Sequence, residues 1–250
     1  NLMDITKAIH EVHFPEEGQD VELYSSMRSE AHRRLIYEEF FWSQLGMAFR
    51  KGRESIEIGI TFKTNGDMVR RFHELFPFAL TDAQKRAITE IERDMSASQC
   101  MRRLLQGDVG SGKTVVAATA MVTACDNGYQ SVILAPTEIL AEQHFRNIKK
   151  WGQELGLSVE ILTGGTGPAE RISITNGMRM GRIHIIVGTH SLIQEGLNFH
   201  KLGLVVIDEQ HRFGVVQRSM LLKKVPVPDV LVMTATPIPR TLAMAVYGDL

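Results

Sequence analysis

A glycine-rich turn that ends in Lys113 and Thr114 is the part of the sequence best suited to chemistry. It reads GDVGSGKT and matches the phosphate-binding pattern GxxxxGK[ST] in full. Its glycines let the backbone curl so that successive N–H groups face a phosphate, and the following helix adds the positive end of its dipole. Lys113 is predicted to reach the β- and γ-phosphates of a bound nucleotide, and Thr114 to bind Mg²⁺. The predicted cofactor-binding residues of this turn are Gly107, Asp108, Val109, Gly110, Ser111, Gly112, Lys113 and Thr114.

An acidic pair follows an apolar run about 95 residues further along the chain, in the stretch LVVIDEQH at 204–211. Four apolar residues predict a buried strand, and Asp208 emerges at its carboxyl end. There it is predicted to coordinate Mg²⁺. Glu209 comes next and offers a carboxylate that can polarise an attacking water.

Each of these features has a simpler interpretation when taken alone. A glycine turn with a surface lysine would give the first, and an exposed acidic pair would give the second. The turn, however, follows an apolar run and opens a helical pattern, as a phosphate loop requires. The two features together therefore favour a nucleotide site with Lys113, Asp208 and Glu209 as its catalytic residues.

Alternating strand and helix patterns must position these residues. Short apolar runs predict six buried strands, at 102–106, 131–137, 158–164, 183–189, 202–208 and 229–236. Helical patterns separate most of them, notably at 113–126 and 138–155, and Thr81 is the predicted N-cap of another helix. The pattern predicts an α/β fold with a doubly wound, mainly parallel sheet, whose ligands bind at the carboxyl ends of the strands.

Residues 1–75 have a different texture and carry no recognisable chemistry. A long amphipathic helix is predicted over 29–54, and its apolar stripe is expected to pack on a partner. The stretch 54–67 is rich in β-formers and contains an Asn65-Gly66 turn signal. We therefore expect a helical linker at 1–75 and a nucleotide-binding lobe at 76–250.

Bulk composition bounds the class of protein. The chain has 250 residues, 44% of them hydrophobic, and a formal net charge of −1, which neither supports nor excludes DNA as a partner. No apolar run reaches the roughly 20 residues that span a bilayer and no secretory signal is visible, so we expect a cytoplasmic protein without a membrane partner. Cys100 and Cys125 are expected to be reduced thiols. The chain lacks an initiating methionine, and we expect a piece of a longer protein.

Several segments resemble the motifs of superfamily 2 helicases and translocases. DEQHRFGVVQR at 208–218 and MTATPIPRTLAM at 233–244 resemble motifs II and III. FALTDAQ at 78–84 resembles the adenine-reading Q motif, APTEILAEQH at 135–144 resembles motif Ia, and VGTHSLIQ at 187–194 resembles the segment before motif II. Together with GDVGSGKT, these segments are similar to the RecG family of bacterial ATP-dependent helicases that act on branched DNA.

The resemblance implies a RecA-like lobe and a role for each matching residue. Gln84 would recognise adenine, Gln210 and His211 would couple the nucleotide site to the DNA-contacting segments, and Thr234 and Thr236 would link hydrolysis to strand movement. The residues that would face the DNA backbone are Pro136, Thr137, Glu138, Gly188, Thr189 and His190. Thr137, Thr189 and Thr236 have helix capping as an alternative role.

The resemblance also implies partners. ATP and Mg²⁺ would bind between this lobe and a second RecA-like lobe, and a wedge domain would precede the linker. The whole protein would be a monomer that remodels stalled forks and junctions in DNA repair and recombination, and the chain alone would hydrolyse ATP poorly. Three alternatives remain: the motor of a transcription-repair coupling factor, a non-catalytic DNA-binding module with a nucleotide fold, and a small-molecule kinase.

Overall fold

The computed structural model of the protein describes residues 2–16, 18–54, 59–189, 192, 197–208 and 227–235. The chain divides into two compact units, the first containing residues 2–54 and the second the described residues from 59 onward. In the described part of the chain, no helix is both long and apolar enough to cross a membrane.

The first unit is helical. Its helices are α1 (Ile5–His13), α2 (Val21–Ser25) and α3 (Glu30–Glu54). Asp4 and Asp20 cap the first two helices through their side chains. Helix α1 contacts α3, and Ala8 and Ala31 are fully buried. These two small side chains let the helices approach closely. The Tyr24 hydroxyl ties α2 to α1 by donating to Glu11 Oε1 over 3.0 Å.

The apolar stripe of α3 stays exposed within the described residues. Phe40 is 64% exposed and Phe49 70%, and the side chains of Ile36 and Phe41 are exposed as well. The helix itself is confirmed, but the packing partner expected for its stripe is not found among the described residues.

The second unit is built on a six-stranded sheet in which every neighbouring pair is parallel. Its strands are β1 (Arg102–Gln106), β2 (Gln130–Leu134), β3 (Val159–Leu162), β4 (Ile185–Gly188), β5 (Leu202–Asp208) and β6 (Asp229–Thr234), in the order β1-β6-β5-β2-β4-β3. The four central strands are almost wholly buried, which explains their continuous apolar runs. The predicted α/β fold with a parallel sheet is confirmed.

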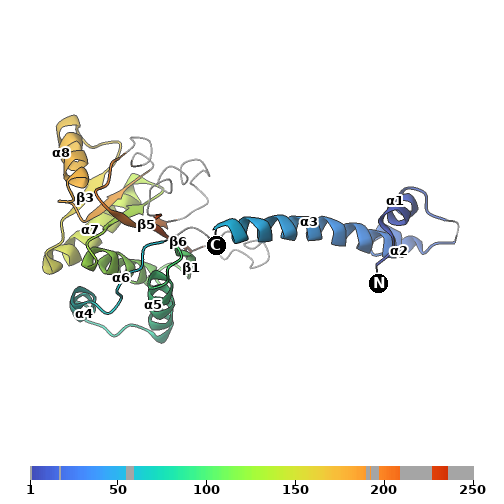
Figure 1. The fold of residues 1–250 in the computed structure, drawn as a ribbon, viewed down its shortest axis with the longest axis horizontal. Helices are drawn as coiled ribbons and strands as arrows, with labels where there is room; N and C mark the ends of the chain where they lie inside the picture. The colour runs from blue at the N-terminus through green and yellow to red at the C-terminus, as the bar shows by residue number, and fades with distance from the viewer. Residues whose placement is uncertain are drawn as a thin grey trace. The chain divides into compact units, whose positions relative to one another are not determined.

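Helices cover both faces of this sheet, as can be followed in Figure 1. The described helices of this unit are α4 (Asp67–Glu74), α5 (Asp82–Met95), α6 (Lys113–Asp126), α7 (Glu138–Leu155) and α8 (Pro168–Arg179). Helices α6, α7 and α8 contact the strands, and α4 and α5 pack against α6. Buried residues of α4 to α7 form one cluster with Ile133, Ile185 and Val206 of the strands. Ile174 and Met178 of α8 belong to a second cluster. Its strand residues alternate along each strand with those of the first cluster.

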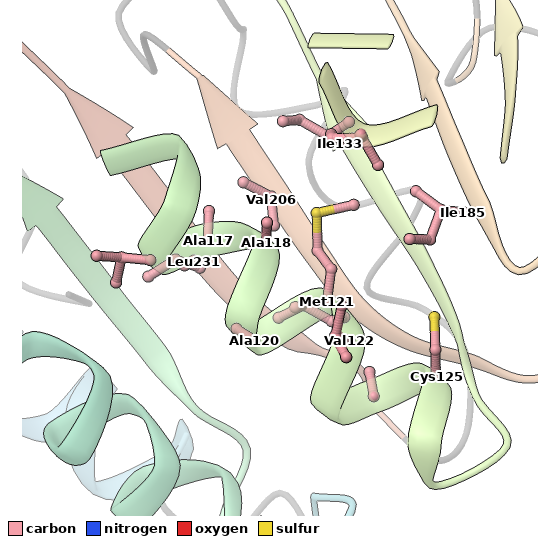
Figure 2. Close-up of a cluster of buried hydrophobic side chains, with 14 of the residues drawn as sticks. Ala117, Ala118, Ala120, Met121, Val122, Cys125, Ile133, Ile185, Val206 and Leu231 are labelled. Atoms are coloured by element: carbon pink, nitrogen blue, oxygen red, sulfur yellow. The ribbon is translucent and has the colours of Figure 1, made fainter. Parts of the chain in front are cut away.

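Helix α6 lies close against the face of the sheet that carries Ile133, Ile185 and Val206, because its side chains are small. Ala117, Ala118 and Ala120 are all at most 3% exposed. Figure 2 shows α6 beside strand residues such as Val206 and Leu231. Since α6 starts at the glycine-rich turn, this packing fixes the direction in which the turn faces.

Residues 59–75 belong to the sheet-containing unit, although sequence analysis assigned them to the linker. Lys63 N–H donates to Asn127 Oδ1, and Asn127 Nδ2 donates back to Lys63 O, each over 2.9 Å. The ring of Phe72 on α4 lies 5.5 Å from that of Trp151 on α7, edge to face. These contacts hold the segment against the ends and sides of α6 and α7.

A buried carboxyl begins β6. Asp229 is fully buried; its Oδ1 accepts a 2.7 Å hydrogen bond from Met101 N–H, and its Oδ2 has no hydrogen-bond partner. Burial raises the pKa of Asp229 to about 8, although the Met101 hydrogen bond acts in the opposite direction.

We therefore expect the stability of this lobe to fall with rising pH through Asp229. Because the pKa of Asp229 is raised in the folded state, protonation of this carboxyl favours the folded state. The contribution is full below the unfolded-state pKa near 3.8 and is lost as pH rises through the folded-state pKa of about 8. Between pH 7 and 9 the loss is about 1.4 kcal/mol. Asp229→Asn should remove this pH-dependent loss. Urea denaturation of wild type and Asp229→Asn at pH 7 and 9 measures the free energies of unfolding. An equal loss in wild type and Asp229→Asn would contradict this assignment.

Candidate functional site

The glycine-rich turn joins the carboxyl end of β1 to the start of α6. Gly110 and Gly112 have φ angles of 83° and 81°, a backbone region that favours glycine. Gly112 is the N-cap of α6, and Lys113 and Thr114 form its first turn. The turn therefore presents the amino end of a helix, as anion binding requires.

Lys113 lies across this turn. Its Nζ donates to Gly107 O over 2.7 Å and to Asp108 O over 2.9 Å. Lys113 and Thr114 are half-buried, whereas Val109 at the tip is 89% exposed. The ammonium is thus held inside the loop, where an incoming phosphate would meet it.

Gln84 contacts the same turn from α5. Its Oε1 accepts from Thr81 N–H over 2.9 Å, and Thr81 Oγ1 accepts from Gln84 N–H, so the two residues form a capping box. Gln84 Nε2 donates to Ser111 O over 3.0 Å. A Cβ on Gly112 would lie only 2.3 Å from that Nε2 nitrogen. The side chain predicted to read adenine therefore also supports the phosphate loop.

We expect Gln84→Ala to weaken the binding of both ATP and inorganic tripolyphosphate, by up to about 10-fold. The loss should reach both ligands because the hydrogen bond to Ser111 O supports the loop and not the base. Thr81→Ala is the matched control: it removes the cap but keeps the Gln84 contact with Ser111. Calorimetric titration measures each affinity, and a loss confined to ATP would mean that Gln84 acts on adenine alone.

Asp208 lies at the same edge of the sheet as the turn. Strand β6 separates β5 from β1, and Asp208 pairs in register with Met233 while Gln106 pairs with Thr234. Neighbouring strands are about 4.8 Å apart, so β1 and β5 are about 10 Å apart. Gly107 N–H donates to Thr234 O over 3.3 Å, which joins the turn directly to the end of β6.

These residues fit a magnesium nucleotide. Mg²⁺ prefers oxygen ligands, keeps several waters and usually takes one or two protein ligands beside the phosphates. The Thr114 hydroxyl and the Asp208 carboxylate are such donors. No group of three or more His, Cys, Asp or Glu side chains that would hold a metal occurs among the described residues.

Asp208 has a partner that sequence reasoning missed. Its Oδ2 lies 2.8 Å from Nε2 of His144 on α7, and both side chains are largely buried, at 14% and 9% exposure. His144 lies within the motif Ia segment but was given no role. A signal was present: Ala141, His144 and Ile148 share the inner face of α7, where a polar residue needs a hydrogen-bond partner.

Motif Ia and its neighbour account for the predicted DNA-facing residues that the structure describes. Pro136 and Thr137 are half-buried, and Thr137 Oγ1 caps α7 by accepting from Leu140 N–H. Glu138 is exposed, and its Oε1 accepts from Gly164 N–H over 2.9 Å. The two remaining residues, Gly188 and Thr189, are buried.

Five predicted site residues lie outside the described residues. They are His190, Glu209, Gln210, His211 and Thr236. Their roles stay predictions.

Comparison with known proteins decides the family. The family model described as "DEAD/DEAH box helicase" matches residues 81–245. The chain belongs to the DEAD/DEAH box helicase family. The matched range contains the glycine-rich turn and Asp208, so the site described above lies within the helicase domain.

Individual helicases match along the whole chain. The "ATP-dependent DNA helicase RecG" of Synechocystis is 48% identical over 100% of this chain, and that of Thermotoga maritima 47%. The chain spans 29% and 31% of these relatives, that is, about a third of their length.

Solved helicase structures agree with the fold. A "Structure of RecG bound to three-way DNA junction" matches 100% of this chain and 33% of the other, with 44% identity and a TM-score of 0.84. The helicase MrfA bound to DNA and AMPPNP matches 77% of this chain and 29% of the other, with 18% identity and a TM-score of 0.57, which supports the fold alone.

Proposed function

We propose that this chain is the first RecA-like motor lobe, with its preceding linker, of a RecG-type helicase that remodels branched DNA in repair and recombination. One observation supports it most: the phosphate loop and Asp208 lie at one edge of the sheet, joined through the Gly107 contact with Thr234. The RecG relatives, at 44–50% identity, support the same function.

In this proposal ATP and Mg²⁺ bind at that edge. Lys113 neutralises charge on the β- and γ-phosphates, and Thr114 and Asp208 hold the metal. Glu209 acts as the general base toward the attacking water. Magnesium supplies charge stabilisation to the transferring phosphoryl group when it is bound. Gln210, His211, Thr234 and Thr236 would transmit the state of the nucleotide to the DNA-contacting loops.

DNA would be held through its backbone. Loops at strand ends can donate N–H and hydroxyl groups to phosphates without reading bases. We propose this role for the residues at the start of α7 and for those at the end of β4 and just after it, namely Pro136, Thr137, Glu138, Gly188, Thr189 and His190. Gly188 and Thr189 are buried, so they would act by shaping their loop. Glu138 would act indirectly, because its carboxylate repels phosphate and already holds Gly164.

The remaining parts of the machine would come from elsewhere in the whole protein. A second RecA-like lobe would close on ATP and reopen after hydrolysis, which would ratchet the duplex, and a wedge domain would engage the junction. We propose a monomer in the cytoplasm, where bacterial DNA is processed.

Stimulation of ATP hydrolysis by different DNA substrates tests this function. In the complete helicase, a three-way or four-way junction should stimulate hydrolysis more strongly than linear duplex of the same length and composition. Equal stimulation would contradict the branched-DNA proposal and would favour a general duplex translocase.

A further inference from the structure

A buried histidine joins α7 to the end of β5. His144 is buried and lies six residues beyond the start of α7. The helix holds it firmly, because Thr137 caps the first turn and the neighbours of His144 on the same face, Ala141 and Ile148, are buried in the core. The ring is therefore fixed relative to the sheet.

The contact with Asp208 is a directed hydrogen bond. The 2.8 Å separation joins Nε2 of the ring to Oδ2 of the carboxylate. An ionised carboxylate can only accept, so Nε2 carries the proton and donates. Hydrogen bonds to charged groups are worth roughly twice those between neutral groups, and burial strengthens them further.

We propose that His144 is a positioning residue for the magnesium site, and this rests on the nucleotide-binding function proposed above. The hydrogen bond uses Oδ2 of Asp208, so Oδ1 can coordinate a metal ion or accept a hydrogen bond from a metal-bound water. A carboxylate that is held by a buried donor cannot rotate away when the metal arrives. Loss of such a supporting contact typically costs about 10- to 100-fold in metal affinity.

Nucleotide affinity with and without metal separates this role from simple packing. The probe is N-methylanthraniloyl-ADP, titrated by fluorescence into the complete helicase in MgCl₂ or in EDTA. For wild type, Mg²⁺ should tighten binding. For His144→Leu, the Kd in EDTA should stay unchanged and the Kd in MgCl₂ should rise about 10-fold or more.

Two amide variants provide the matched pair. The amide of His144→Gln reaches the position of the histidine Nε2 and should restore most of the Mg²⁺ effect. The amide of His144→Asn ends near the position of Nδ1, falls short of Asp208 and should behave like His144→Leu. This pair keeps the test decisive if the leucine variant does not fold.

A double-mutant cycle completes the design. In an Asp208→Asn background, His144→Asn should cause no further loss of the Mg²⁺ effect, because the carboxylate that it positions is gone. The proposal is overturned if His144→Asn keeps the full wild-type Mg²⁺ effect, or if it weakens binding equally in MgCl₂ and EDTA. Failure of wild type itself to bind nucleotide would instead refute the proposed function.

Discussion

The 250-residue chain alone is expected to hydrolyse ATP about 10³- to 10⁵-fold more slowly than the same chain joined to a second motor lobe. In the described site, Lys113 lies across the glycine-rich turn of a single lobe. In phosphoryl transfer, an arginine supplied across the cleft stabilises the charge of the transition state, and its absence accounts for a loss of this size. Steady-state release of phosphate from the two proteins, with branched DNA present, measures the ratio.

Two controls make that comparison sharp. Both proteins should bind ATP·Mg, since the loop and Asp208 are present in each. The complete helicase with Lys113→Ala gives the background from contaminating ATPases. Rapid DNA-stimulated turnover by the chain alone would show that the first lobe carries all catalytic groups, against the two-lobe proposal.

Much of the sheet-containing unit could be predicted from the sequence, because its helices and strands follow from local patterns of apolar, capping and glycine residues. The run at 102–106 and the helices at 113–126 and 138–155 have the predicted bounds. Strands buried on both faces have unbroken apolar runs, and N-cap residues mark where helices begin. Gly110 and Gly112 lie where the backbone needs a positive φ, so the glycine-rich turn could also be predicted from the sequence.

Contacts between distant segments could not be predicted in this way. Residues 54–67 suggested a strand, but the described part, from Gly59 onward, has none before α4. Instead, Gly59 N–H donates to Ser98 O and Phe62 N–H to Met95 O, at the carboxyl end of α5. Propensity describes how well a residue fits an extended backbone, but whether a neighbouring strand exists to pair with depends on the tertiary fold.

The site shows the same division. Residue types and spacing predicted that the loop and Asp208 would lie at one edge of the sheet. That Gln84 supports Ser111 and that His144 holds Asp208 depends on how α5 and α7 pack, since these partners are 27 and 64 residues apart. The insertion of β6 between β1 and β5 likewise follows from the fold as a whole.

Lys113→Ala is expected to weaken ATP·Mg binding by about 10- to 100-fold, which corresponds to the loss of charge-assisted hydrogen bonds to phosphate of about 1.5–3 kcal/mol. Hydrolysis by the complete helicase should fall by about 10²- to 10³-fold, because the ammonium also stabilises charge that develops in the transition state. The substitution further removes the donors to Gly107 O and Asp108 O, so the loop loses an internal support.

Lys85→Ala is the matched control for this loss of one positive charge. Lys85 is exposed on α5, and its Nζ lies 3.8 Å from Asp82 at the surface. Exposed ion pairs of this kind contribute little, so stability and ATP affinity should stay near wild type. Calorimetric titration of both variants gives the affinities, and melting curves show that each is folded. If Lys113→Ala and wild type bind ATP·Mg equally, the glycine-rich turn is not a phosphate loop, because a phosphate bound there would lose the positive charge that Lys113 supplies.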